Sequence, residues 1–177
     1  LLDTIEGVSA YTWRASAFSL VFSKERTYGV LITGIDPDRE ASVSTIETLV
    51  REGDYLSPSD EAEALVGRLL ATNLKVAPGD ELVVLGQGRD GSVAATVLRV
   101  KGIFSSGQDE FDRSFVFMPL TYFQEVYFLD GAVHEPTDLS ALQLLLGRGR
   151  ARRSPVRLCA VLDGKVLPVP LPLGVVA

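Results

Sequence analysis

Two strand-like runs joined by a glycine-rich turn, at residues 81–86 and 93–104, constrain the fold more than any other feature of the sequence. Both runs are rich in aliphatic and β-branched residues, and the intervening GQGRDG segment has the composition of a tight turn. The pattern predicts a hairpin of two antiparallel strands. The glycine-rich segment lacks the lysine of a phosphate-binding loop and joins two strands, so it does not indicate a nucleotide site.

Other predicted strands and helices interleave along the chain without a regular strand–helix–strand rhythm. The segments 28–35 and 114–120 have the composition of strands. A helix is expected over 61–74, where leucines recur on one face. Thr121 and Gln124 have the spacing of a capping box at the start of another helix. This order favours an α+β fold over a doubly wound parallel sheet.

Local signals also mark where the first helices begin. Asp36 followed by Pro37 is typical of an N-cap and the first position of a helix. Ser44 and Glu47 have the spacing of a second capping box, which predicts a helix to about residue 51. The GIDP segment is therefore interpreted as a strand-to-helix turn of the scaffold.

Charge is unevenly distributed along the 177 residues, whose net charge is −6. Residues 1–146 hold 11 basic and 22 acidic side chains, whereas residues 147–177 hold 6 basic and 1 acidic. An acidic body repels phosphate backbones, so we expect no nucleic-acid partner. A single cysteine, Cys159, excludes an intramolecular disulfide framework. The longest uncharged run, 166–177, is too short for the roughly 20 residues that span a bilayer.

No set of residues in the sequence has the pattern of a catalytic or metal centre. His134 is the only histidine, and no G-x-S-x-G stretch supplies a nucleophile. Asp109, Glu110 and Asp112 cluster between two predicted strands, but they lack the alternating spacing of a calcium loop. A solvated loop is the better interpretation of these acids, and an enzyme is the weakest hypothesis for the chain.

The C-terminal part of the chain differs in composition from the rest. Its signals are weak after residue 131, although 156–162 has the pattern of a strand. This part also contains a run of arginines: Arg148, Arg150, Arg152, Arg153 and Arg157. A flexible, solvated linker is one interpretation of this run, and contact with anionic lipid or nucleic acid is another. A reading-frame change in a GC-rich gene is a third interpretation of the altered composition.

Four motifs occur in an order that resembles a known family. They are G-[IV]-D-P-x-x-E at Gly34–Glu40, G-x-[YF]-L at Gly53–Leu56, a helix pattern ending in G-D at Val66–Asp80, and V-x-G-[IV]-F at Val100–Phe104. This order resembles the extracytoplasmic domain of FtsX-like ABC-transporter permeases, often called the MacB-like periplasmic core domain. The closer resemblance is to the lipoprotein-releasing branch.

The resemblance implies an α+β domain with a mixed, largely antiparallel sheet and packed helices over residues 1–136. Residues 137–177 would be a C-terminal segment that forms the rest of the same domain and leads toward a membrane helix. The domain would be non-enzymatic and lie on the extracytoplasmic side of the bacterial inner membrane. It would hold no cofactor, because a separate cytoplasmic ATPase subunit or domain binds ATP. Its partners would be that ATPase, a second permease subunit in a homodimer or heterodimer, and a lipoprotein, drug or peptide as cargo.

The loop 105–113 is the candidate contact with cargo or a partner, since loops on a rigid scaffold often carry function. It places Phe111 among Asp109, Glu110 and Asp112. The ring is expected either to pack against the sheet or to be presented to a partner, and packing is the preferred hypothesis. A free-standing ligand-binding module with no transport role is the alternative function.

Overall fold

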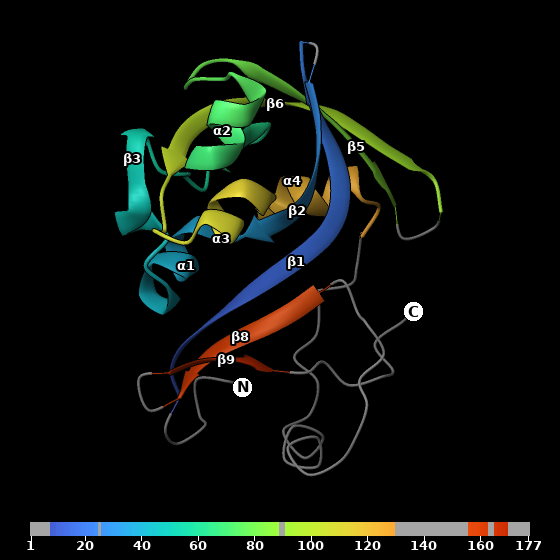
Figure 1. Ribbon diagram of the computed structural model, residues 1–177. Coiled ribbons are helices and arrows are strands. Elements are labelled where there is room, and N and C mark those ends of the chain that lie inside the picture. The colour runs from blue at the N-terminus through green and yellow to red at the C-terminus, as the bar shows by residue number, and fades with distance from the viewer. Residues whose placement is uncertain (1–7, 25, 89–90, 130–155, 163–164, 170–177) are drawn as a thin grey trace.

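The computed structural model of the protein describes residues 8–24, 26–88, 91–129, 156–162 and 165–169. In this part of the chain a mixed sheet of nine strands carries four short α-helices and one 3₁₀ turn (Figure 1). The strands are β1 (Val8–Ser23), β2 (Arg26–Ile35), β3 (Val50–Gly53), β4 (Glu63–Gly67), β5 (Glu81–Gln87), β6 (Val93–Phe104), β7 (Phe115–Pro119), β8 (Val156–Leu162) and β9 (Lys165–Val169). The helices are α1 (Pro37–Val43), α2 (Arg68–Leu74), α3 (Asp109–Ser114) and α4 (Leu120–Val126), with the 3₁₀ turn η2 at Glu47–Leu49.

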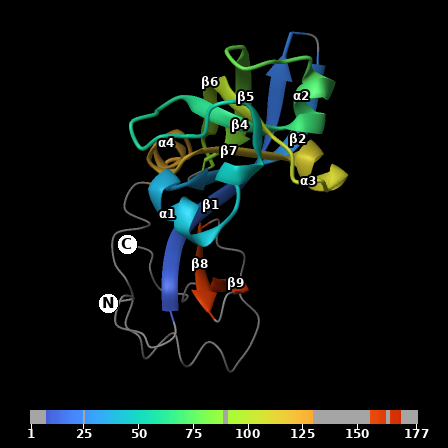
Figure 2. The ribbon, with the colours of Figure 1, turned by 90° about the vertical axis from the view of Figure 1, so that its left-hand side faces the viewer.

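Six of the strands close into a ring. The pairings run from β1 to β2, β7, β4, β6 and β5, and β5 pairs with β1 again. Closure depends on the length of β1, whose residues 19–22 face β2 along one edge and β5 along the other. The other end of β1 pairs with β8, and Figure 2 shows β8 and β9 extending the sheet beyond the ring.

The sheet is mixed and largely antiparallel, as predicted. Among the described strands, β2–β7 and β4–β6 are parallel and the other seven pairings are antiparallel. The predicted hairpin is confirmed, because β5 and β6 pair antiparallel from Glu81↔Arg99 to Gln87↔Val93. The predicted strand at 156–162 is confirmed as β8.

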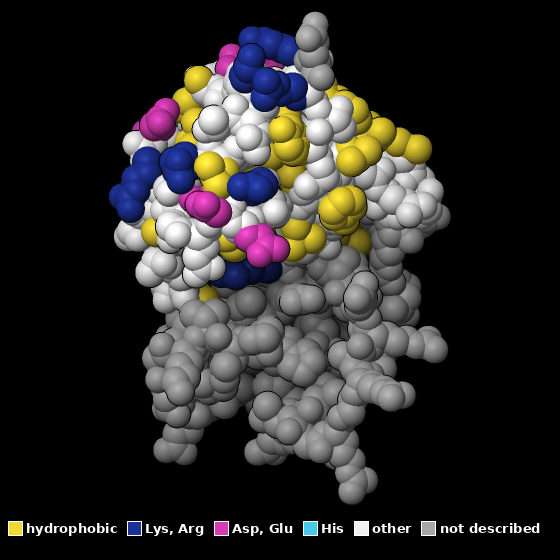
Figure 3. Space-filling view, in the orientation of Figure 1, with side chains coloured by type: hydrophobic (Ala, Val, Ile, Leu, Met, Phe, Trp, Pro, Cys, Tyr) yellow, Lys and Arg dark blue, Asp and Glu magenta, His cyan; other side chains and the backbone are white. Residues whose placement is uncertain are grey.

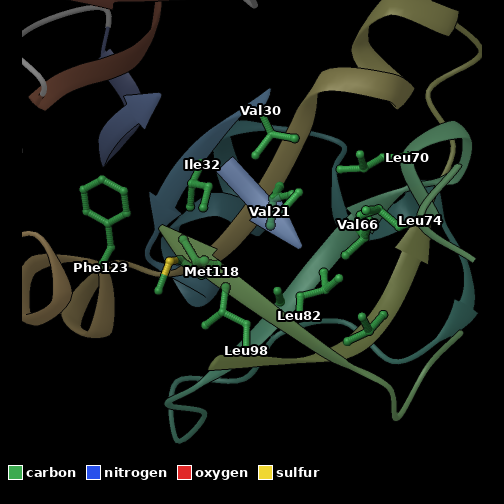
Figure 4. Close-up of a cluster of buried hydrophobic side chains, with 14 of the residues drawn as sticks. Val21, Val30, Ile32, Val66, Leu70, Leu74, Leu82, Leu98, Met118 and Phe123 are labelled. Atoms are coloured by element: carbon green, nitrogen blue, oxygen red, sulfur yellow. The ribbon is translucent and has the colours of Figure 1, made fainter. Parts of the chain in front are cut away.

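The main hydrophobic core fills the interior of the ring. Side chains alternate along β5 and β6, so that Leu82 and Leu98 are fully buried while their neighbours face outward. Figure 4 shows side chains from several strands, among them Ile32, Leu82, Leu98 and Met118, converging on this interior. Burial of so many aliphatic side chains is the main force that holds the ring closed.

Helix α1 is fixed by the GIDP turn and by a buried ion pair. Asp36 is the N-cap and accepts a hydrogen bond from the Arg39 amide, and Pro37 begins the helix, as predicted. The fully buried Glu40 carboxylate accepts hydrogen bonds from the Arg14 guanidinium of β1 through both of its oxygens. Burial and the negative charge of Glu40 raise the pKa of the nearby Tyr55 hydroxyl. The GIDP turn therefore has a structural role: it starts α1, which the ion pair of Glu40 and Arg14 holds against β1.

The predicted helix over 61–74 is wrong in its first half. Glu63–Gly67 forms strand β4, and only Arg68–Leu74 is helical. Strand β4 lies between β6 and β7, so that four consecutive residues from 64 to 67 are buried on both faces. An amphipathic helix exposes one side of such a run, whereas an internal strand buries all of it.

Both predicted capping boxes are also wrong. Ser44 is the C-cap of α1, and the residues after it form η2 and then β3 instead of a helix to residue 51. Helix α4 forms close to where it was predicted, but its N-cap is Pro119 and no side chain caps it. Its Tyr127 hydroxyl lies 2.5 Å from Ser19 Oγ, a buried contact that joins the end of α4 to β1.

The segment 105–113 is a short loop followed by helix α3, and Asp112 anchors it. Asp112 is fully buried, which contradicts the expectation of a solvated acid. Its carboxylate accepts hydrogen bonds from the Ser106 amide at 2.8 Å, the Ser106 hydroxyl at 2.7 Å and the Ser105 hydroxyl at 3.0 Å. The backbone fits closely here, because a Cβ at Gly67 would lie 2.2 Å from the Asp112 carbonyl oxygen.

The ionised form of Asp112 is favoured in the folded protein. Burial acts to raise the pKa of its carboxyl, but the hydrogen bonds from Ser106 and Ser105 and the positive charge of Arg68 outweigh burial and lower it. A carboxyl with a lowered folded pKa contributes stability above its unfolded pKa, and this contribution is lost as the pH falls through the folded value.

Asp112→Asn is therefore expected to lower the free energy of unfolding at pH 7 by about 1–3 kcal/mol, since hydrogen bonds to a charged group are each worth that order. Urea unfolding at a series of pH values should show the difference from the wild type shrinking below the unfolded pKa of about 3.9. The exposed neighbour Asp109, changed to Asn, is the matched control and should alter stability little. A difference that stays constant down to acid pH would contradict the role assigned to Asp112.

Candidate contact surfaces

The first candidate surface is the edge formed by α3 and the start of β7. Phe111 is half-buried, and its ring stacks on Phe115 with centroids 4.2 Å apart. It also meets the buried Phe104 edge-on at 5.7 Å. These rings belong to a second hydrophobic cluster beside the main core, which includes Ile35, Leu56 and Leu65. The structure therefore packs the Phe111 ring while leaving part of it accessible.

The four predicted contact residues do not act together. Asp109 and Glu110 are exposed in the first turn of α3, and Phe111 lies beside them. The Asp112 side chain is buried, and its carboxylate accepts hydrogen bonds from Ser105 and Ser106, so no partner can reach it. We call the other three, Asp109, Glu110 and Phe111, together with the neighbouring Phe115, the α3 edge. Helix α3 lies beside α2, as Figures 1 and 2 show.

The second candidate surface was missed by the sequence analysis. It lies on the outside of the ring, where β1, β5 and β6 run side by side. Large apolar side chains gather there, and Figure 3 shows hydrophobic side chains over β1 and β5. We call this surface the outer apolar face: Phe18, Leu20, Phe22, Val83, Leu85, Val93, Ala95 and Val97.

Strand register makes the outer apolar face continuous. Leu20 lies opposite Leu85, which lies opposite Ala95. Two residues further along each strand, Phe22 lies opposite Val83, which lies opposite Val97. Phe18 is 70% exposed and Val93 71%, values that a core position never shows. The alternation of β5 and β6 was visible in the sequence, but which strands would flank them was not.

Neither surface has the donor set of a metal or catalytic site. Within the described residues no group of three or more His, Cys, Asp or Glu side chains could hold a metal ion. The Lys101 ammonium forms ion pairs with Asp60 and, at 3.0 Å, with Glu63. No helix in the described ranges is long and apolar enough to cross a membrane. His134 and the arginines from 148 to 153 lie outside the described residues.

Phe111→Ala is expected to destabilise the domain by about 2–3 kcal/mol, somewhat less than the about 3–5 kcal/mol of a fully buried phenylalanine. The ring loses its contacts with Phe104 and Phe115, but part of its surface was already in water. Thermal unfolding followed by circular dichroism measures the change. Glu110→Ala, its exposed neighbour, should move the midpoint little. A Phe111→Ala protein as stable as the wild type would show that the ring does not pack.

Comparison with known proteins identifies the domain. A family model described as the MacB-like periplasmic core domain matches residues 1–146. No curated sequence is similar enough to the chain to count as a relative. The fold is similar to the extracellular domain of the noncanonic ABC-type transporter YknZ from Gram-positive bacteria, with a TM-score of 0.53 and 15% identity over 70% of this chain and 61% of that one.

A second solved structure, the periplasmic region of MacB from Actinobacillus actinomycetemcomitans, aligns with a TM-score of 0.49 and 13% identity over 70% of this chain and 54% of that one. The chain covers less than two thirds of either structure's own length. The α+β architecture agrees with the fold that the sequence motifs implied. With a family model matching residues 1–146, the chain belongs to the family of MacB-like periplasmic core domains.

Proposed function

We propose that this domain is the extracytoplasmic part of an ABC-transporter permease and takes part in ATP-driven export. The observation that carries the proposal is the family match over residues 1–146, supported by the likeness of the fold to the extracellular domain of a transporter. The motif order in the sequence favours the lipoprotein-releasing branch, in which the cargo is a lipid-anchored protein. A drug or peptide is the cargo if the domain belongs to an exporter of the MacB type.

The domain's role in this proposal is mechanical and not catalytic. A separate cytoplasmic ATPase binds and hydrolyses ATP, and the permease works as a homodimer or heterodimer. A closed ring around a packed apolar core is stiff, so movement of the membrane segments displaces its surface as one body. The domain thereby transmits this movement to the cargo or partner protein bound to it.

We assign contact with cargo or a partner protein to the α3 edge. Its exposed carboxylates, Asp109 and Glu110, stand next to two half-buried rings, Phe111 and Phe115. Aromatic rings with a polar border are typical of the energetically important part of a protein interface. Asp112 contributes by holding the helix in place and not by touching the partner.

The alternative function, a free-standing ligand-binding module, needs polar groups that converge on a ligand. The buried polar side chains Glu40, Asp112 and Ser19 are instead bound to Arg14, to two serines and to Tyr127. A polar group already paired within the fold has little left to offer a ligand. These pairings favour the transport role.

Labelling of single cysteines in the full-length protein tests the proposed location. In a background in which Cys159 and any other native cysteine are changed to serine, Ser42→Cys places a thiol on the exposed surface of α1, and Ala94→Cys places one in the buried core as the matched control. A membrane-impermeant maleimide added to intact cells, with any outer membrane permeabilised, should label the first variant and spare the second. Labelling of Ser42→Cys only after the inner membrane is broken would contradict an extracytoplasmic location.

A further inference from the structure

Two lysines in the described chain adopt a backbone conformation that residues with a side chain rarely take. Lys24, in the turn between β1 and β2, has a φ of 50°, and Lys75, the C-cap of α2, has a φ of 56°. Among the other described residues that are not glycine, Phe128 alone has a positive φ. Turns and helix ends of these kinds favour glycine, because a Cβ is strained in the left-handed region. A lysine at each position therefore lowers stability, and such strain is retained mainly where a function requires it.

The two lysines lie at one end of the molecule, together with Arg26. The Arg26 guanidinium of β2 donates a hydrogen bond from Nη1 to the Asn73 carbonyl oxygen of α2, 2.5 Å away. This bond joins the β1–β2 turn, which holds Lys24, to the end of α2, where Lys75 is the C-cap. Figures 1 and 2 show α2 beside this end of β2, and Figure 3 shows Lys and Arg side chains gathered there. We call Lys24, Arg26 and Lys75, which are all exposed, the basic tip.

The described residues do not neutralise the charges of the basic tip. No ion pair within the described part of the chain includes a member of the tip. Asp80 lies in the turn that follows Lys75, but its carboxylate accepts a hydrogen bond from the Ala77 amide. Glu25 lies outside the described residues, and its single negative charge still leaves the three cations of the tip in excess. The tip is therefore positive in a chain whose net charge is −6.

The fold requires one of these three cations. Arg26 donates to a carbonyl at the end of α2, where a positive charge is favourable. The side chains of Lys24 and Lys75 make no hydrogen bond or ion pair in the ranges that the structure describes. Glycine would suit their backbone better. What the two lysines add is positive charge on an exposed surface, which points to recognition of an anionic group.

We propose that the basic tip is a docking surface for a protein partner that presents a cluster of carboxylates. Charge complementarity selects this partner, because exposed cations attract an anionic surface, speed its encounter and disfavour basic partners. The basic tip shares no residue with the α3 edge. The proposal therefore concerns a second surface, and it does not depend on the transport role.

The number of cations distinguishes a protein partner from an extended polyanion. Recognition of anionic lipid typically uses clusters of about 4–8 Lys or Arg side chains. Tight binding to nucleic acid commonly uses about 6–10 phosphate contacts. The basic tip has three cations, and an extended polyanion would also meet the acidic remainder of the surface. A local cluster of carboxylates on a protein can contact the tip alone.

Titration of the ¹⁵N-labelled chain with hexaglutamate, followed by NMR, tests the proposal. This peptide supplies clustered carboxylates without a fold of its own. The amide signals of Lys24, Arg26 and residues 73–76 should shift more than those elsewhere in the chain. Raising the salt concentration from about 20 mM to about 150 mM should weaken binding, because salt screens charges on exposed surfaces.

Lys24→Gly combined with Lys75→Gly is the decisive variant, because it removes two charges and relieves both positive φ values. Its affinity for hexaglutamate should fall at least about threefold. Urea unfolding should show it to be at least as stable as the wild type. Lys24→Arg combined with Lys75→Arg keeps both charges and should bind like the wild type. Arg51→Gln combined with Arg113→Gln removes two exposed charges elsewhere and should also bind like the wild type.

Any of four results would overturn the proposal. The first is a titration in which the amides of the basic tip do not shift. The second is equal binding by the wild type and the double glycine variant. The third is a double glycine variant less stable than the wild type, because the lysines would then serve the fold. The fourth is flotation of the wild type, but not of the double glycine variant, with phosphatidylglycerol vesicles while hexaglutamate does not bind, because the occupant would then be a membrane surface.

Discussion

Strand β1 pairs along both of its edges, and the rest of the structure depends on this. Its sixteen residues reach β2 on one edge and β5 and then β8 on the other. Without the pairing to β5 the six strands would form an open sheet, and the core between them would face water on one side. A ring leaves fewer unpaired strand edges than an open sheet, and it encloses the aliphatic side chains that face inward. Arg14, near the middle of β1, also holds Glu40 and so fixes α1.

The ring explains why the two candidate surfaces differ in character. At the α3 edge, a helix of six residues is too short to hold its own shape, so buried contacts made by Asp112 and the phenylalanine cluster hold it. The surface of the α3 edge combines exposed carboxylates with partly accessible aromatic rings, a composition compatible with transient binding. The outer apolar face is made of side chains from strands alone, and strand register determines which of them lie together. Along these strands alternate side chains point outward and form the apolar surface, while the side chains between them point inward and form the core.

Local patterns predicted the elements that depend on local physics. The β5–β6 hairpin, the Asp36–Pro37 helix start and the strand at 156–162 follow from turn chemistry and side-chain alternation. Strand β4 was mistaken for helix because its burial comes from β6 and β7, which lie far away in sequence. Asp112 could not be told from its acidic neighbours, since only the fold shows which carboxylate meets Ser105 and Ser106. The outer apolar face was missed for the same reason: apolar residues in a strand do not reveal whether anything covers them.

Hydrogen exchange at the amides of β1, followed by NMR, tests the closure of the ring most directly. Successive amides of a strand point to opposite edges, so a strand paired on one edge protects every second amide. The pairing of residues 19–22 with both β2 and β5 predicts that all four amides exchange slowly, at rates close to those of global unfolding. Alternating protection along 19–22, with every second amide exchanging fast, would show an open sheet and contradict the account.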